Sequence, residues 1–396
     1  MPDTEKSSIL PYGRQLIDQT DRDAVADVLG DPFLTTGPKI AEFEAGLCRV
    51  TGARHAVACA NGTAALHLAC MALGISNRDL GVTSPNSFLA SANCVEFCGA
   101  TADFIDIDPA TLCMSPEKLD AYCRDVAVPR VVIPVSFAGL AADLPAIKAL
   151  SETYGFAVIE DAAHALGSEY RSNGTSYACG SCSHSDLAIF SFHPVKTVTS
   201  GEGGAVMTND DVLAGHLRCL RNHGMAPPCK TPGSMEHGAW YYEMHGLGYN
   251  YRLTDIQAAL GLSQLEKLLE FCARRRQIVA MYHKAFAGSK ELLILPHEHL
   301  ATRACPHLYP IQFKGGAQIR QQVYEALKKE NIFTQVHYIP IYWQPYYAEK
   351  YRYARGKCPA AETYYSRCLS LPLFPAMSDS DVGRVVDRVL CHVKGR

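Results

Sequence analysis

Residues 190–204 read FSFHPVKTVTSGEGG, and the organisation of the chain can be worked out from this stretch. It begins inside one apolar run, Ser185–Phe192, and ends where a second, Gly204–Thr208, begins. Apolar runs of this length, separated by small and polar residues, indicate buried strands joined by a loop. The loop carries Lys196, which we therefore expect just beyond the end of a buried strand.

The same alternation extends upstream as far as Thr51. Short apolar runs predict strands, and the stretches between them carry apolar residues at helical spacing. The expected strands are His55–Ala58, Leu80–Thr83, Ala102–Ile105, Arg130–Pro134 and Ala157–Glu160, and the expected helices are Gly62–Leu73, Ser87–Cys98, Ser115–Cys123 and Leu144–Tyr154. This order predicts an α/β fold in which helices cover both faces of a largely parallel sheet.

The pattern changes in the last third of the chain. Thr254 is a candidate N-cap for one long helix that runs through Leu268 and on towards Tyr282. Mixed strands and helices follow. Because 396 residues exceed one ordinary domain, we expect a large domain over residues 1–250, with the N-terminal segment included, and a small C-terminal domain over residues 251–396.

Composition excludes several classes of protein. A net charge of −3 provides no basic surface for nucleic acid and no polybasic patch for a membrane. The first apolar stretch, Ile9–Tyr12, is too short for a signal-peptide core, and no apolar run is long enough to span a bilayer. We therefore expect a cytoplasmic protein.

The 16 cysteines are scattered along the chain. Many stand at apolar positions, where cytosolic thiols behave as small hydrophobic groups. Examples are Cys59, Cys70, Cys94 and Cys98. The CxxC pair Cys179 and Cys182 lacks the second ligand pair of a structural metal site, so we expect no metal.

Two expected strand–helix turns suit a flat, phosphorylated ligand, since ligands of such sheets bind beyond the strands' carboxyl ends. Gly62, Thr63 and Ala64 open a helix with small residues, which leaves backbone N–H groups accessible to a phosphate. Phe88, after another strand, is placed to stack on a planar ring. For either segment alone, the simpler explanation is structural: a capped helix with small packing residues, or a core aromatic.

Two other strand ends carry titratable groups. Asp161 is placed to pair with a protonated ring nitrogen, and His164 follows three residues later. Ser191 is within reach of a phosphate, and burial at Lys196 would help its amine to lose a proton. Alone, Asp161 and His164 are equally explained as a helix cap and a packed histidine, and for a single lysine a surface position in a turn is the simpler explanation. Together the four segments supply the groups that pyridoxal 5′-phosphate (PLP) requires.

Five motifs occur in an order that resembles the DegT/StrS family of sugar aminotransferases over nearly the whole chain. They are NGTAAL (61–66), EDAAHALGS (160–168), FSFHPVKTVTSGEGG (190–204), RNHGM (221–225) and GYNYRLTDIQAALG (248–261). The resemblance implies a fold type I PLP-dependent enzyme. Its large domain would hold a mostly parallel seven-stranded sheet flanked by helices, followed by a smaller C-terminal α/β domain.

The resemblance also implies roles for matching residues. Lys196 would bind the cofactor as a Schiff base and shuttle protons, Asp161 would bind the pyridine nitrogen, and His164 would lie beside the ring. Phe88 would cover one ring face. The cofactor-binding set would be completed by Gly62, Thr63, Ala64 and Ser191 around the phosphate, and by Asn250 reaching the neighbouring subunit's cofactor. A homodimer with shared active sites is therefore implied, with Thr35, His223, His337 and Tyr338 near the sugar nucleotide.

Within the family, several segments resemble the branch that aminates C4 of a UDP-linked 4-keto-6-deoxy sugar in pseudaminic acid formation, with L-glutamate as donor. They are PYGRQ (11–15), LTTGP (34–38), GYNYRLTDIQAALGLSQL (248–265) and VHYIPIY (336–342). Dehydratase relatives carry a histidine in place of Lys196, and the first strand–helix turn lacks the G-x-G-x-x-G of nicotinamide enzymes. Another UDP- or dTDP-linked sugar, or a non-catalytic regulatory protein, stays open.

Overall fold

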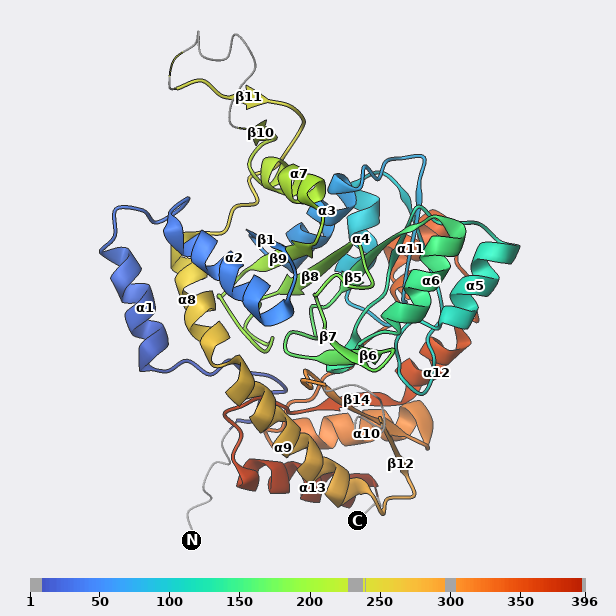
Figure 1. Cartoon of the computed structure of the whole chain (residues 1–396). Coiled ribbons are helices and arrows are strands. Elements are labelled where there is room, and N and C mark those ends of the chain that lie inside the picture. The colour runs from blue at the N-terminus through green and yellow to red at the C-terminus, as the bar shows by residue number, and fades with distance from the viewer. Residues whose placement is uncertain (1–8, 227–237, 239, 296–303, 394–396) are drawn as a thin grey trace.

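The computed structural model describes residues 9–226, 238, 240–295 and 304–393. At its centre lies a seven-stranded sheet in the order β1-β9-β8-β5-β4-β2-β3 (Figure 1). Only β9 runs antiparallel to its neighbours in this sheet, which confirms the mostly parallel prediction. The strands are β1 (His55–Cys59), β2 (Leu80–Thr83), β3 (Thr101–Phe104), β4 (Val131–Ile133), β5 (Ala157–Asp161), β8 (Leu187–Ser191) and β9 (Gly204–Thr208).

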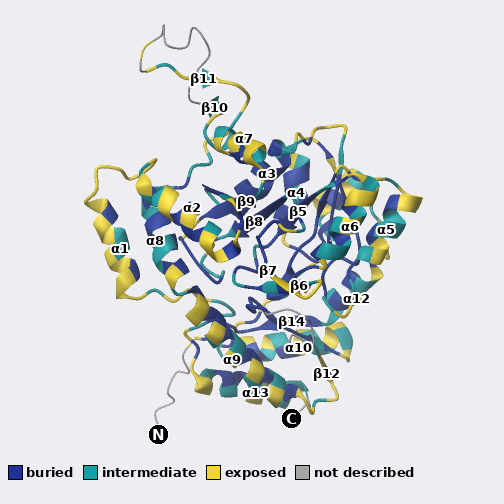
Figure 2. Ribbon diagram, viewed as in Figure 1, coloured by how far each residue is buried: buried dark blue, intermediate teal, exposed yellow. Residues whose placement is uncertain are grey.

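Helices cover both faces of this sheet, because successive residues of each strand point to opposite sides. Val132 of β4 packs in a cluster with α5 (Pro116–Asp125) and α6 (Leu144–Tyr154). Its neighbours Val131 and Ile133 belong to the main core, which includes α3 (Gly62–Ala72) and α4 (Ala90–Phe97). Figure 2 shows the central strands in dark blue, as expected of a sheet buried on both sides.

The C-terminal part of the chain builds a second hydrophobic core beside the first. Its helices and strands are α9 (Leu268–Phe286), β12 (Leu292–Ile294), β13 (Tyr309–Phe313), α10 (Gly316–Lys329), β14 (Cys368–Leu371) and α13 (Asp379–Val393). Leu10 joins this core, whereas Tyr347 of α11 (Pro345–Tyr351) and Tyr364 of α12 (Pro359–Arg367) pack in the main one. The chain thus crosses between the two cores more than once, and the division at residue 250 stays a proposal.

The helix expected from Thr254 is interrupted. Thr254 caps α8 (Asp255–Glu266), with its hydroxyl accepting the Gln257 N–H at 3.2 Å, as the sequence predicts. Lys267 then leaves helical geometry, and α9 begins at the next residue. The Lys267 ammonium lies 2.7 Å from the buried Asp21 carboxylate of α1 (Gln19–Leu29), and this ion pair anchors the junction.

Several further elements had no clear signal in the sequence. They are α1, α2 (Pro38–Thr51), α7 (Asp211–Arg221) and two hairpins, β6 (Glu169–Ser172) with β7 (Thr175–Ala178) and β10 (Met225–Ala226) with β11 (Glu243–Met244). Hairpins this short and this exposed carry little of the alternation that marks a buried strand. The β10–β11 arm extends away from the body of the protein at the top of Figure 1.

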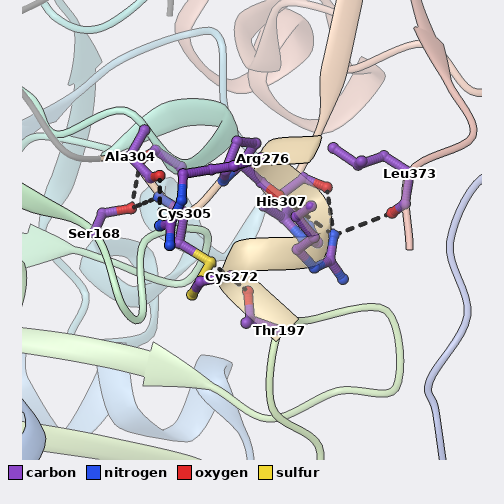
Figure 3. Close-up of a disulfide and its surroundings, with 11 residues drawn as sticks. Ser168, Thr197, Cys272, Arg276, Ala304, Cys305, His307 and Leu373 are labelled. Carbon is purple, nitrogen blue, oxygen red and sulfur yellow. Dashed lines mark hydrogen bonds between the residues drawn. A yellow bond between two sulfur atoms is a disulfide. The ribbon is translucent and has the colours of Figure 1, made fainter. Parts of the chain in front are cut away.

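One cysteine pair departs from the expected pattern of free thiols. Cys272 of α9 and Cys305 form a disulfide (Figure 3). Both stand at apolar positions 33 residues apart, so spacing alone could not pair them. The bond ties α9 to the segment before β13, next to Ser168 and Thr197. The cysteines named above as free thiols, including the CxxC pair, are all free.

Candidate active site

A cavity of about 680 Å³ opens at the carboxyl end of the sheet. It brings together most of the residues that the sequence singles out. Those lining it are Gly62, Thr63, Phe88, Asp161, His164, Ser191, Lys196, His337 and Tyr338. The cavity is also lined by residues that the sequence did not single out, among them Tyr12, Ser87, Ser91, Glu202 and Gln344.

The α3 N-terminus and the end of β8 form one side of the cavity. Asn61 caps α3 by accepting the Ala64 N–H at 2.8 Å. A Cβ atom on Gly62 would lie 2.8 Å from the Ser191 Cβ, so only glycine lets the helix start approach Ser191 this closely. Backbone N–H groups at a helix start and a serine hydroxyl thus lie side by side, an arrangement that fits a phosphate.

Asp161 ends β5 and lies next to β8 in the sheet. Its side chain is buried, with Oδ1 accepting the Ala163 N–H at 3.1 Å and Oδ2 accepting the Ser91 hydroxyl at 2.6 Å. Burial raises the pKa of Asp161, while the two hydrogen bonds and the charge of Lys196 act in the opposite direction. A buried carboxylate bordering a cavity is suited to hold a protonated ring nitrogen.

Lys196 lies in the loop after β8 and lines the same cavity. Burial lowers the pKa of Lys196 from its ordinary 10.5 to about 8, against the opposing charge of Asp161. An amine with a lowered pKa is a better nucleophile near neutral pH than a surface lysine. The simpler explanation, a solvated turn lysine, does not fit these surroundings.

Three buried histidines lie at the cavity: His164 and His337 line it, and His307 packs against His164. The His164 Nε2 lies 3.3 Å from the Tyr338 hydroxyl, and its ring centroid is 4.4 Å from that of His307. Burial lowers the pKa of all three, so they are neutral near pH 7. Among the described residues, nothing hydrogen-bonds the buried His164 Nδ1, which leaves a polar atom for a bound group.

His307 was not found by sequence reasoning, because no motif marks it. It lies beside the disulfide in Figure 3, and its backbone N–H donates to Ala138 at 2.9 Å. Its contact with His164 joins residues far apart in the chain. Only a tertiary structure could bring it to notice.

Four predicted site residues do not line this cavity in the part of the chain that the structure describes: Ala64, Thr35, His223 and Asn250. The Ala64 N–H is bonded to Asn61. Thr35 and Asn250 are exposed and form isolated bridges with Thr254 and Asn222. His223, also exposed, donates its backbone N–H to Tyr249. These three exposed residues therefore lie outside the chain's own cavity lining.

The fold and this cavity define the class: the protein is a PLP-dependent sugar aminotransferase. The chain belongs to the DegT/DnrJ/EryC1/StrS aminotransferase family, whose model matches residues 15–390. The spore coat polysaccharide biosynthesis protein SpsC of Bacillus subtilis is 40% identical over 396 residues, which cover 99% of each protein.

Solved structures agree with this assignment. Helicobacter pylori PseC, an aminotransferase involved in the biosynthesis of pseudoaminic acid, has a TM-score of 0.89 and 29% identity, covering 98% of this chain and 100% of that one. Streptococcus pneumoniae Spr1654 in its PLP form has a TM-score of 0.88 and 26% identity, covering 98% and 99%. It is also known in a PMP form. The cofactor is therefore pyridoxal 5′-phosphate, and the cavity residues fit it.

No group of three or more His, Cys, Asp or Glu side chains among the described residues is arranged to hold a metal ion. None of the described helices is both long and apolar enough to cross a membrane.

Proposed function

We propose that this protein transfers the amino group of L-glutamate to a UDP-linked 4-keto-6-deoxy sugar. The proposed acceptor is UDP-2-acetamido-2,6-dideoxy-β-L-arabino-hexos-4-ulose, and the product is the 4-amino sugar nucleotide of pseudaminic acid biosynthesis. The observation that carries the proposal is the likeness to PseC, which extends over 98% of this chain. The presence of His337 and Tyr338 in the cavity lining supports it, since these residues match a segment of that branch.

A second acceptor is favoured by a different observation. The sequence identity to SpsC, 40%, exceeds the 29% shared with PseC. SpsC is named for spore coat polysaccharide biosynthesis. Another UDP- or dTDP-linked keto sugar, destined for a polysaccharide, is therefore the alternative acceptor, with the same cavity and the same amino donor.

Bound PLP would act as an electron sink and carry the amino group from donor to acceptor. Several residues of the chain would bind the cofactor, each at a different part of it. Lys196 would bind it covalently, and Asp161 would hold its ring nitrogen. The α3 start at Gly62–Ala64, with Ser191, would bind the phosphate. Phe88, which lines the cavity and is 59% exposed, would cover one ring face, and His164 would lie beside the ring.

Lys196 would also move the protons. In the first half-reaction, its Nζ would take a proton from the α-carbon of glutamate. In the second, it would return a proton to C4 of the sugar. Both steps need a lysine that cycles between neutral and charged forms near neutral pH. Because burial lowers the pKa of Lys196 to about 8, both its neutral and its charged forms are accessible near neutral pH.

The pH dependence of cofactor capture should follow the pKa of Lys196. Only the neutral amine attacks an aldehyde, so protonation below about pH 8 should slow capture. We expect the rate for the cofactor-free protein to rise up to about pH 8 and then level off. Stopped-flow absorbance measures the rate of cofactor capture at each pH. A free lysine derivative serves as the reference for the cofactor's own titration. A rate that kept rising towards pH 10, as it should for the free amine, would contradict the lowered pKa.

The active protein is proposed to be a homodimer with shared sites. Thr35, His223 and Asn250 are exposed and outside the chain's own cavity lining, which suits residues that serve a second copy. The exposed arm nearby supports the same assembly. Its large apolar side chains include Trp240, 82% exposed, and Leu247, 74% exposed, and such surfaces are commonly covered by a partner.

Replacement of Asn250 tests the shared site. Asn250→Ala should weaken cofactor affinity about 10–100-fold, because a hydrogen bond to a charged phosphate would be lost. Lys196 would still bind the cofactor covalently. Fluorescence titration of the cofactor-free protein measures the change, with the exposed Asn77→Ala as matched control. Unchanged affinity, or tight cofactor binding by a monomer in sedimentation experiments, would count against the shared site.

A panel of substrates tests the proposed reaction. UDP- and dTDP-linked 4-keto sugars are each incubated with glutamate, and amino-sugar product and 2-oxoglutarate are measured. The proposal expects the UDP-linked β-L-arabino 4-ulose to give the highest kcat/KM. Preference for another keto sugar would select the alternative acceptor. Protein that stays colourless with added cofactor, and so has no colour for borohydride to bleach, would instead indicate a non-catalytic binding protein.

A further inference from the structure

Two serine hydroxyls lead in series to the Asp161 carboxylate. The Ser91 hydroxyl lies 2.6 Å from Asp161 Oδ2, and the Ser87 hydroxyl lies 2.6 Å from that of Ser91. All three side chains are buried, with exposed fractions of 3%, 1% and 5% for Ser87, Ser91 and Asp161. Both serines also line the cavity. The chain of hydrogen bonds therefore lies at the edge of the site and has little contact with solvent.

The direction of these hydrogen bonds follows from charge. An ionised carboxylate only accepts, so Ser91 must donate its one hydroxyl proton to Asp161. Ser91 then has no proton left for Ser87, and Ser87 must donate to Ser91. Two hydroxyl dipoles aligned in this way strengthen each other towards the carboxylate. With the Ala163 N–H on Oδ1, both oxygens of Asp161 are held in place.

The Ser91 hydroxyl is not needed by its own helix. Serine near a helix start usually bonds the backbone N–H groups of the first turn. Here α4 has no side-chain cap, and the Ser91 backbone N–H bonds the Phe88 carbonyl without using the hydroxyl. The side chain reaches instead to a residue 70 positions away in the chain. This observation favours a role at Asp161 over a role in local helix structure.

The hydrogen bond from Ser91 also opposes the effect of burial. Burial favours the neutral form of Asp161, and the Ser91 hydroxyl is the largest of the contributions that favour the ionised form. Without Ser91, a larger fraction of Asp161 would be protonated. A protonated carboxyl group cannot form an ion pair with a protonated ring nitrogen.

We propose that Ser91 is a positioning residue for transamination, which holds the Asp161 carboxylate ionised and oriented towards the ring nitrogen, and that Ser87 fixes the direction of the Ser91 hydroxyl. The inference rests on the proposed role of Asp161 and is independent of which sugar is the acceptor. In this role Ser91 would act through Asp161, to which its hydroxyl donates.

The test uses the holoenzyme and three variants: Ser91→Ala, Ser91→Thr and Ser151→Ala. Ser151 is the matched control, since its buried hydroxyl donates at 2.7 Å to the Phe156 carbonyl, outside the cavity lining. Two quantities are measured without any sugar: the single-turnover rate with glutamate, and the pH at which the bound cofactor's absorbance titrates. Thermal unfolding is followed in parallel.

Ser91→Ala should slow the glutamate half-reaction about 10–100-fold, the effect of losing a hydrogen bond to a charged group. It should also shift the pH at which the cofactor's absorbance titrates. Ser91→Thr should restore both. Ser151→Ala should lower only the unfolding temperature. If Ser91→Ala does not fold, Ser87→Ala should show the same absorbance shift in weaker form.

The inference would be wrong if Ser91→Ala kept the parent's rate and absorbance titration, or if Ser151→Ala produced the same changes. These outcomes are distinct from failure of the proposed function. Parent protein that bound no cofactor, or gave no reaction with glutamate, would show that Asp161 has no ring nitrogen to hold. A different preferred sugar would leave the measurements with glutamate unaffected.

Discussion

Replacement of Lys196 by alanine is expected to reduce transamination at least about 10⁴-fold, because one group provides both the covalent link to the cofactor and the proton transfers. The fold should survive. Burial lowers the pKa of Lys196, so its charged form is disfavoured in the folded chain, and alanine removes that cost. The loop keeps its backbone hydrogen bond from the Lys196 N–H to the His193 carbonyl at 2.8 Å.

Two measurements separate catalysis from folding in this variant. Product formation from glutamate and the keto sugar gives the activity, and thermal unfolding followed by circular dichroism gives the stability. Lys39→Ala serves as the matched control, since Lys39 pairs with the exposed Glu42 side chain and lies outside the cavity lining. It should keep parental activity. A Lys196→Ala protein with near-normal transamination would refute the assignment of this lysine.

The strands of the sheet could be predicted because buried strands have a strong local signal. Leu80–Thr83 and Gly204–Thr208 were predicted with the boundaries that β2 and β9 have in the structure. The break between α8 and α9 could not be predicted, since apolar residues at helical spacing continue through Lys267. At this break Lys267 forms an ion pair with Asp21, a contact between distant parts of the chain.

The residues of the candidate site likewise fall into those that the local sequence could predict and those that it could not. Asp161, Ser191 and Lys196 follow strand ends, and topology brings such ends to one edge of the sheet. Ser91 and His307 match no motif, so no pattern in the sequence selects them. The Ser91 hydroxyl donates to Asp161, and the His307 ring packs against the His164 ring. Both contacts join residues that are distant in the chain.

The exposed site candidates form a third group. Asn250 and His223 were selected by resemblance, together with the expectation of a second subunit. Their proposed partners belong to another copy of the chain. Their exposure and the apolar arm beside them are the physical reasons to pursue the dimer.

Asp161→Asn should lower kcat about 10²–10³-fold, the usual cost of losing one preorganised charge contact in an active site. The amide has nearly the shape of the carboxylate, and its oxygen can still accept from Ser91 or Ala163. It carries no charge to keep a ring nitrogen protonated. Because burial raises the pKa of Asp161, the ionised carboxylate is a cost to the folded, cofactor-free chain at neutral pH. Removing that cost offsets part of the hydrogen bond lost at the other oxygen, so the cofactor-free variant should stay folded, which thermal unfolding measures.

The neighbouring Glu160 provides the control for this variant. It is also a buried acid on β5, with a pKa that burial raises to about 7, but its carboxylate bonds the Ser136 hydroxyl and the Gly180 N–H. Adjacent residues of a strand point to opposite faces, so Glu160 serves the packing behind the sheet while Asp161 borders the cavity. Glu160→Gln should keep kcat within about twofold, because it removes a buried charge that touches no reacting group. Equal losses of kcat in the two variants would mean that Asp161 acts through the fold and not on the ring nitrogen.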